Sequence, residues 1–161
     1  MCKPHLALLL SIALAAHFAA VAESSEELVG SVTEVKGTAR VLRPGGEFAA
    51  EKGTRLYTSD IIHTGPDAGI GIVLRDDTTL SLGPSSELKM AEFKFEPNEG
   101  LLGMTLSVAK GTLVYISGQI AKLAPGAAQI ETPAGVAAVR GTELLVDVPA
   151  PKASRKAEKA P

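Results

Sequence analysis

The chain has 161 residues, of which 16 are Lys or Arg and 18 are Asp or Glu, so its formal net charge is −2. A chain of this length fits about one domain with a core of its own. The near-neutral charge and the 4% of aromatic residues argue against a nucleic-acid-binding protein, which needs a basic surface and often uses stacking rings. The one cysteine excludes an internal disulfide and a thiolate metal cluster, and 45% hydrophobic residues exclude a disordered chain.

The amino terminus has the pattern of an export signal, and we expect a signal peptide over residues 1–22. Lys3 precedes the apolar run 6–16, and a small-residue cleavage site ends at Ala22. Cleavage after Ala22 would place the protein in the periplasm or outside the cell. The alternative is an uncleaved membrane anchor, because the apolar stretch approaches the shortest spanning length of about 17 residues. Cleavage would leave a chain without cysteine and with His63 as its only histidine.

Residues 23–28 are interpreted as a linker and residues 29–148 as one β-domain. Apolar residues there alternate with polar or small ones in short runs, which is typical of strands with one buried face. The clearest runs are 70–74, 80–82, 102–108 and 144–148. Because Gly, Pro and Asp turn signals separate them, we predict an all-β, jelly-roll-like β-sandwich of short antiparallel strands. Segment 117–124 could form a helical turn, but irregular chain or strand is favoured.

The composition changes after residue 148. Segment 149–161 contains three prolines, four basic residues and one acidic residue, which predicts a disordered tail of net charge +3. Without this tail and the signal peptide, residues 23–148 have a net charge of −6. The tail is either a solvated end without a specific role or a weak tether to an anionic envelope surface.

The sequence contains no convincing catalytic or metal-binding set. Asp60 lies three positions before His63, and residues three apart on a strand point to opposite faces, so the two are poorly placed to cooperate. One histidine without clustered carboxylates is a poor zinc site, and Asp76-Asp77 is better explained as a hairpin turn than as a calcium site. We therefore predict a protein that is not an enzyme and that holds no metal or cofactor.

The most distinctive motif lies within residues 130–144. Together with an upstream element, its motif residues are Asp60, Thr64, Gly65, Thr132, Pro133, Gly135, Arg140, Gly141 and Thr142. These residues and their spacing resemble the FecR domain family, and the resemblance extends over about residues 30–148. One departure is Asp77, where the family often has Gly, a change that affects the turn type rather than the fold. The resemblance implies an all-β, jelly-roll-like domain, in agreement with the alternation.

The motif also has a physical interpretation of its own. Pro133 begins a strand at a position where no N–H group is needed. Residues 136–139 are small and alternate between two faces, so this strand could be covered on both sides. Arg140 follows at a Gly-Thr bend, where we expect its guanidinium to hold the last two strands together by binding a carboxylate or turn carbonyls. Asp60 is a candidate partner for Arg140, and the alternative role of Arg140 is to bind another protein.

The best-known FecR proteins are inner-membrane signal transducers with a cytoplasmic segment that regulates a sigma factor and a periplasmic part that senses a loaded outer-membrane transporter. Because this chain begins with an export signal, we expect the periplasmic module alone, without direct sigma-factor regulation. The leading hypothesis is an exported, non-catalytic binding or sensing module of the bacterial cell envelope, with an envelope protein as its partner. Strand edges and the acidic surface are the expected contacts.

Two alternatives are a glycan- or peptidoglycan-binding module and, less favoured, a carboxylate-based hydrolase. The low aromatic content weakens the glycan alternative, because sugar faces usually stack on rings. We expect neither nucleic acid as a partner nor a transmembrane span after cleavage.

Overall fold

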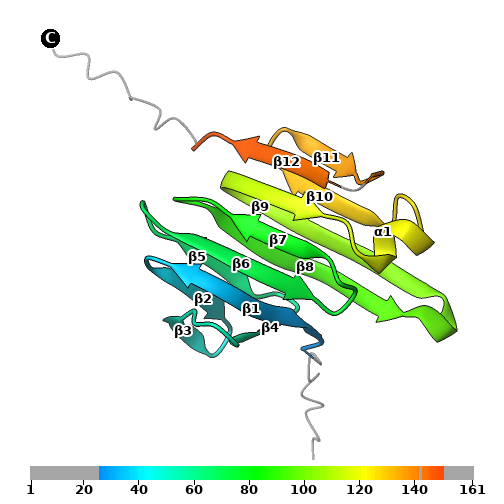
Figure 1. The fold of residues 1–161 in the computed structure, drawn as a ribbon, viewed down its shortest axis with the longest axis horizontal. Coiled ribbons are helices and arrows are strands. Elements are labelled where there is room, and N and C mark those ends of the chain that lie inside the picture. Colours follow the sequence, from blue (N-terminus) through cyan, green and yellow to red (C-terminus); the bar gives the residue numbers. More distant parts are fainter. Residues whose placement is uncertain (1–25, 142, 151–161) are drawn as a thin grey trace, which may run out of the picture.

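A computed structural model of the protein describes residues 26–141 and 143–150 (Figure 1). The strands in chain order are β1 (Leu28–Lys36), β2 (Ala39–Arg43), β3 (Gly46–Ala49), β4 (Arg55–Tyr57), β5 (Ile61–Thr64), β6 (Gly69–Leu74), β7 (Thr79–Leu82), β8 (Glu87–Glu96), β9 (Leu101–Ile116), β10 (Ala128–Thr132), β11 (Gly135–Ala138) and β12 (Glu143–Val148). A 3-10 turn, η1 (Pro97–Glu99), joins β8 to β9, and a helix, α1 (Gln119–Leu123), joins β9 to β10. The predicted signal peptide and most of the predicted tail lie outside the described residues. Within the described residues, no helix is long and apolar enough to cross a membrane.

The 16-residue strand β9 connects the two halves of the fold. Its first part pairs with β8 and β10, and its last part, from Gly111 onward, pairs with β7 and β12. Gly111 has φ +89°, and a Cβ atom at this position would collide with the main chain and side chain of Ser86. Glycine therefore permits both the backbone conformation and the close approach at the point where β9 passes from one layer to the other.

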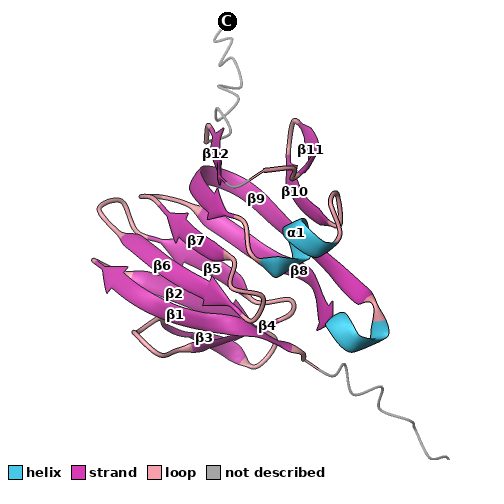
Figure 2. Cartoon of the chain, turned by 45° about the vertical axis from the view of Figure 1, so that its right-hand side comes forward, coloured by secondary structure: helices cyan, strands magenta, loops and turns pink. Residues whose placement is uncertain are grey.

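The strands form one sheet that curls into two facing layers (Figures 1 and 2). One layer has the order β3-β2-β5-β8-β9-β10-β11, and the other has the order β4-β1-β6-β7-β9-β12. All pairs are antiparallel except β9–β10, which is parallel because α1 returns the chain before β10 begins. The predicted all-β fold is confirmed, with this one parallel pair as a difference.

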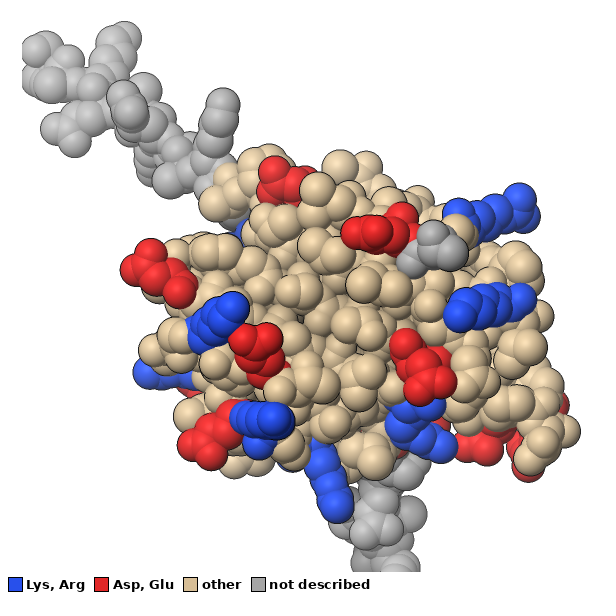
Figure 3. Space-filling model, in the orientation of Figure 1, with Lys and Arg blue, Asp and Glu red and all other residues tan. Residues whose placement is uncertain are grey.

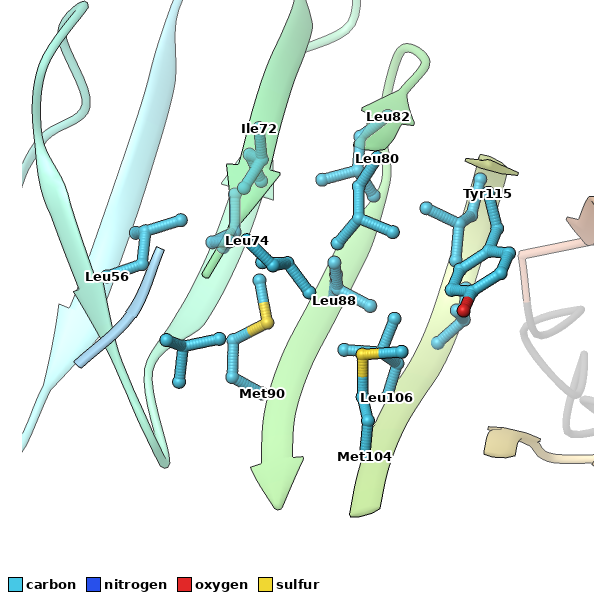
Figure 4. Close-up of a cluster of buried hydrophobic side chains, with 14 of the residues drawn as sticks. Leu56, Ile72, Leu74, Leu80, Leu82, Leu88, Met90, Met104, Leu106 and Tyr115 are labelled. Carbon is cyan, nitrogen blue, oxygen red and sulfur yellow. The ribbon is translucent and has the colours of Figure 1, made fainter. Parts of the chain in front are cut away.

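The core lies between the layers and is built from alternating apolar residues (Figure 4). In β6, buried and half-buried residues alternate strictly, as the period of two predicts. Burying each large apolar side chain contributes roughly 1.5–3 kcal/mol relative to leaving it exposed. The largest fully buried side chains are Leu56, Ile62, Ile72, Leu80, Leu82, Leu88, Met90, Phe93, Met104, Leu106, Leu113 and Tyr115.

Helix α1 lies within segment 117–124, so the expectation of irregular chain or strand there is wrong. The helix has no side-chain cap of its own, because its N-cap residue is Gly118. Instead, the turn between β6 and β7 supplies the acceptors: the Asp76 carboxylate accepts from the Ile120 N–H at 3.2 Å, and the Asp76 carbonyl accepts from the Gln119 N–H at 2.7 Å. These bonds come from a distant part of the chain, so local sequence could not indicate them.

Candidate functional site

An apolar groove of about 710 Å³ opens between the β10–β11 hairpin and β12. In Figure 2, β10, β11 and β12 lie together at one end of the molecule. The lining residues are Ala109, Ile130, Thr132, Pro133, Ala134, Gly135, Val136, Ala137, Leu144, Leu145, Val146, Asp147, Val148 and Pro149. Most of them belong to the segment that resembles the FecR motif, so the most distinctive part of the sequence surrounds the groove.

The groove exists because the inward residues of β11 are small. Ala137 lies opposite Ile130 and Gly135 lies opposite Thr132, so these four residues share the face of the hairpin that looks toward the other layer. Ile130 is fully buried, whereas all four residues of β11 are exposed. The expectation that β11 could be covered on both sides is therefore not met within the described residues.

The two layers also end differently at this side of the molecule. Beyond β9, one layer continues with β10 and β11, while the other continues with β12 alone. Among the described strands, β11 pairs only with β10, and β12 pairs only with β9. Each therefore has a free edge beside the groove, and a free edge presents unpaired backbone N–H and C=O groups.

The surface of β12 beside the groove is acidic and apolar. Glu143, Leu145 and Asp147 lie on the outward face, opposite Ile116, Val114 and Thr112 of β9. All three outward residues are exposed, and Leu145 retains 65% of its accessible surface. Acidic side chains lie along the surface over β12, and the centre of the same face is uncharged (Figure 3). The groove thus combines apolar walls with an acidic rim.

The Thr132-Pro133-Gly135 part of the motif forms the turn of the β10–β11 hairpin. The Thr132 hydroxyl donates to the Gly135 carbonyl at 3.0 Å and accepts from the Ala134 N–H at 3.3 Å. Gly135 has φ +152°, which L side chains rarely adopt. These bonds fix the hairpin that forms one wall of the groove.

The second part of the motif follows β11. Arg140 is exposed, and Thr142 lies outside the described residues. The Gly141 carbonyl accepts a hydrogen bond from the Ser117 hydroxyl, at the end of β9. Ser117 therefore ties the chain between β11 and β12 to the base of α1.

The suggested pairing of Asp60 with Arg140 is wrong, because Asp60 binds Arg43. The Arg43 Nε lies 2.7 Å from Asp60 Oδ1, and its Nη2 lies 2.6 Å from Oδ2. The Asp60 carboxylate also accepts from the Tyr57 N–H at 2.9 Å. Hydrogen bonding to Asp60 raises the pKa of the Arg43 guanidinium above its ordinary value. Strands β8, β9 and β10 separate this pair from β11.

Two aromatic rings pack against the guanidinium of this ion pair. The Arg43 guanidinium carbon lies 4.6 Å from the centre of the Tyr57 ring and 5.1 Å from that of Phe48. Rings at such distances favour a cation. The cluster joins the β2–β3 hairpin to the turn before β5, and the sequence offered no spacing or motif by which Arg43 could be identified.

Thr64 and Gly65 also have structural positions away from the groove. The buried Thr64 hydroxyl donates to the Gly83 carbonyl at 2.7 Å and accepts from the Ser86 N–H at 2.8 Å. The Gly65 N–H donates to the Thr38 carbonyl at 2.8 Å. The Thr64 bonds join the end of β5 to the turn between β7 and β8, and the Gly65 bond joins it to the turn between β1 and β2. The upstream motif element therefore stabilises the fold, whereas Thr132, Pro133 and Gly135 of the later element line the groove.

The remaining candidate catalytic residues, His63 and Asp76, do not come together with Asp60 in one site. His63 Nε2 lies 3.8 Å from Glu87 on the outer surface, whereas Asp60 is fully buried. The buried Asp76 carboxylate is occupied by hydrogen bonds from the Thr78 N–H and hydroxyl and from α1. Across residues 26–141 and 143–150, no group of three or more His, Cys, Asp or Glu could hold a metal ion.

A family model described as FecR protein matches residues 60–157, more than half of the chain. Domains of this family are non-catalytic sensing or signalling domains of the cell envelope and are usually periplasmic. No curated protein and no solved structure matches the chain. The family match covers the groove and both parts of the motif, in agreement with the sequence resemblance, and the chain belongs to the FecR family.

Proposed function

We propose that this protein is an exported FecR domain that binds an envelope protein in the groove between β10–β11 and β12. The observation that supports the proposal is the coincidence of three properties at one place. The groove is apolar, two strand edges border it, and the Thr132-Pro133-Gly135 part of the family motif lines it. Apolar grooves beside free strand edges are surfaces that other protein chains use.

The proposed location rests on the amino-terminal pattern and on the family. Lys3, the apolar run and the small-residue site ending at Ala22 form a signal-peptide pattern. FecR domains are usually periplasmic. An exported binding domain would meet its partner in the envelope, without a catalytic step.

The same groove favours a protein partner over a glycan. None of the described lining residues is aromatic, whereas sugar faces usually stack on aromatic rings. The walls are formed by aliphatic side chains such as Ile130, Leu144 and Val146, which suit aliphatic side chains of another protein.

Photo-crosslinking in intact cells tests the proposal. A photoreactive amino acid would replace the exposed, inward Ala137 in one strain and the exposed Lys89 on the outer surface of β8 in another. We expect the Ala137 position to give a discrete adduct with one envelope protein, identified by mass spectrometry, and the Lys89 position to give none. The same adducts from both positions, or none from Ala137, would contradict the proposal.

A further inference from the structure

The unequal ends of the two layers leave room for one more strand. Strand β11 extends its layer beyond β10, and the facing layer ends at β12. A strand added to the free edge of β12 would lie across the groove from β11. We propose that the occupant of the groove is an extended segment of the partner protein that pairs with β12. This inference rests on the proposed function and adds the chemistry of the segment.

The side chains that would enter the groove must be large and apolar. They would face Gly135 and Ala137 of β11, which are too small to fill the space. Ile130 of β10 forms the floor of the groove. Of the inward residues of β12, Leu144 and Val146 are only half-buried although they pack against the core, and Val148 is buried. Leu- or Ile-sized side chains at alternate positions of an added strand would complete this apolar layer.

The side chains on the outward face of the segment must match the acidic rim. Glu143 and Asp147 lie on the outward face of β12, four residues apart, with Leu145 between them. Side chains directly opposite on paired strands interact, and opposite charges there are favourable. The segment would therefore place Lys or Arg opposite Glu143 and Asp147 and an apolar residue opposite Leu145. The resulting pattern is basic, apolar, apolar, apolar, basic.

Charge disfavours a second copy of this chain as the occupant. An antiparallel pairing of two β12 strands centred on Leu145 would place Glu143 of each copy opposite Asp147 of the other. Like charges directly opposite on paired strands are destabilising. A separate protein with basic residues at those positions meets no such repulsion.

The tail of this chain has basic residues at the required spacing but lacks the large apolar residues between them. Lys152 and Lys156 have the four-residue spacing, and the described chain reaches Pro149 at the groove. The residues that would then point into the groove are Ala153 and Arg155. Ala153 is too small to fill the space, and Arg155 would place a charge among aliphatic side chains.

Two synthetic peptides test the inference on the purified chain without residues 1–22. One has the core Lys-Leu-Val-Leu-Lys and the other the core Glu-Leu-Val-Leu-Glu, each flanked by Gly-Ser and labelled for fluorescence anisotropy. We expect the basic peptide to bind about tenfold more tightly at low salt, because two attractions replace two repulsions. The double variant Glu143→Lys/Asp147→Lys should reverse the preference. Equal binding of both peptides to the wild-type chain would overturn the inference.

A matched pair of variants tests the position of the peptide. Ala137→Leu fills the groove and should weaken the basic peptide by about tenfold or more, whereas Ala138→Leu, on the opposite face of the same strand, should leave its affinity unchanged. Unchanged affinity in Ala137→Leu would overturn the inference.

Tighter peptide binding after deletion of residues 151–161 would assign the groove to the tail. Competition between the peptide and a dimer would assign it to a second copy. Either outcome would also overturn it.

The outcomes distinguish this inference from the function on which it rests. One possible outcome is that an envelope protein crosslinks to position 137 while the basic and acidic peptides bind equally well. That outcome would support the proposed function and overturn the inference about the sequence of the added strand. Failure of both experiments would overturn the two together.

Discussion

The carboxylate of Asp60 and the guanidinium of Arg43 form a two-point ion pair, with N–O distances of 2.7 and 2.6 Å. Asp60 is fully buried, and the Arg43 side chain retains 22% of its accessible surface. Removing one partner of such a pair leaves the other desolvated without compensation. Asp60 of the family motif is thus a structural residue, and its substitution should lower the free energy of unfolding.

We predict that Asp60→Asn lowers the free energy of unfolding by about 3 kcal/mol. The matched control is Glu47→Gln, which removes an exposed ion pair with Arg40 and should cost at most about 0.5 kcal/mol. Urea unfolding followed by circular dichroism measures both. Similar losses in the two variants would show that the burial of the Asp60 pair has no special effect.

Gly111→Ala should be one of the most destabilising single-methyl changes in the chain. The backbone there has φ +89°, and the new methyl would collide with Ser86. Strain and overpacking together predict a loss of about 3 kcal/mol or more. Gly103, on the same strand, has open space around it and is the control. Its change to alanine should cost less than about 0.5 kcal/mol in the same urea titration; a loss equal to that of Gly111→Ala would refute the steric explanation.

The buried Tyr115 should make the folded protein less stable at alkaline pH. Its ring is fully buried, its hydroxyl has no hydrogen-bond partner among the described residues, and burial raises the pKa of its phenol. Nearby Thr78 and Ser117 oppose part of this rise in pKa, but their hydroxyls already donate to Asp76 and to the Gly141 carbonyl. The phenol is therefore a buried polar group that the fold does not satisfy.

The sign of the pH dependence follows from that raised pKa. Above the ordinary tyrosine pKa of about 10, the unfolded chain releases the proton while the folded chain keeps it, so stability falls as pH rises. Tyr115→Phe should remove this part of the alkaline loss and leave stability at pH 7 unchanged or slightly higher. Thermal unfolding of both proteins between neutral pH and pH 11 measures the difference. Parallel curves for the two proteins would contradict the prediction.

The export prediction has a direct chemical test. Cleavage after Ala22 would give a mature chain that begins at Glu23. Intact-mass measurement of the protein from a periplasmic fraction should give the mass of residues 23–161. A mass that includes residues 1–22, recovered with membranes, would support the uncleaved anchor instead.

The alternating strands could be predicted from the sequence because their burial depends on local pattern. Strands β6 and β7 follow the period of two in Ile70, Ile72, Leu80 and Leu82, all of which are buried. The family motif could be found because its residue types and spacing resemble a known family, and its Thr132-Pro133-Gly135 part forms a local turn. These features need no knowledge of distant contacts.

Other features depend on contacts that no local pattern encodes. Helix α1 forms on acceptors from Asp76, 44 positions earlier in the chain. Asp60 binds Arg43 across neighbouring elements, and nothing in the spacing distinguishes Arg43 from other arginines. The groove arises from small residues on β11 together with the unequal ends of the layers, and only the strand order reveals that combination.

The central claim is that a partner protein docks in the groove. Amide hydrogen exchange tests it most directly, measured on the protein with and without the partner that crosslinking identifies. If the partner docks in the groove, the backbone amides of β12 and β11 should become protected when it binds. The amides of β3, an exposed edge strand at the far side of the same layer as β11, should not change. Protection confined to β11 and β12 is the result that the account predicts, and protection at β3, with none at β12, would contradict it.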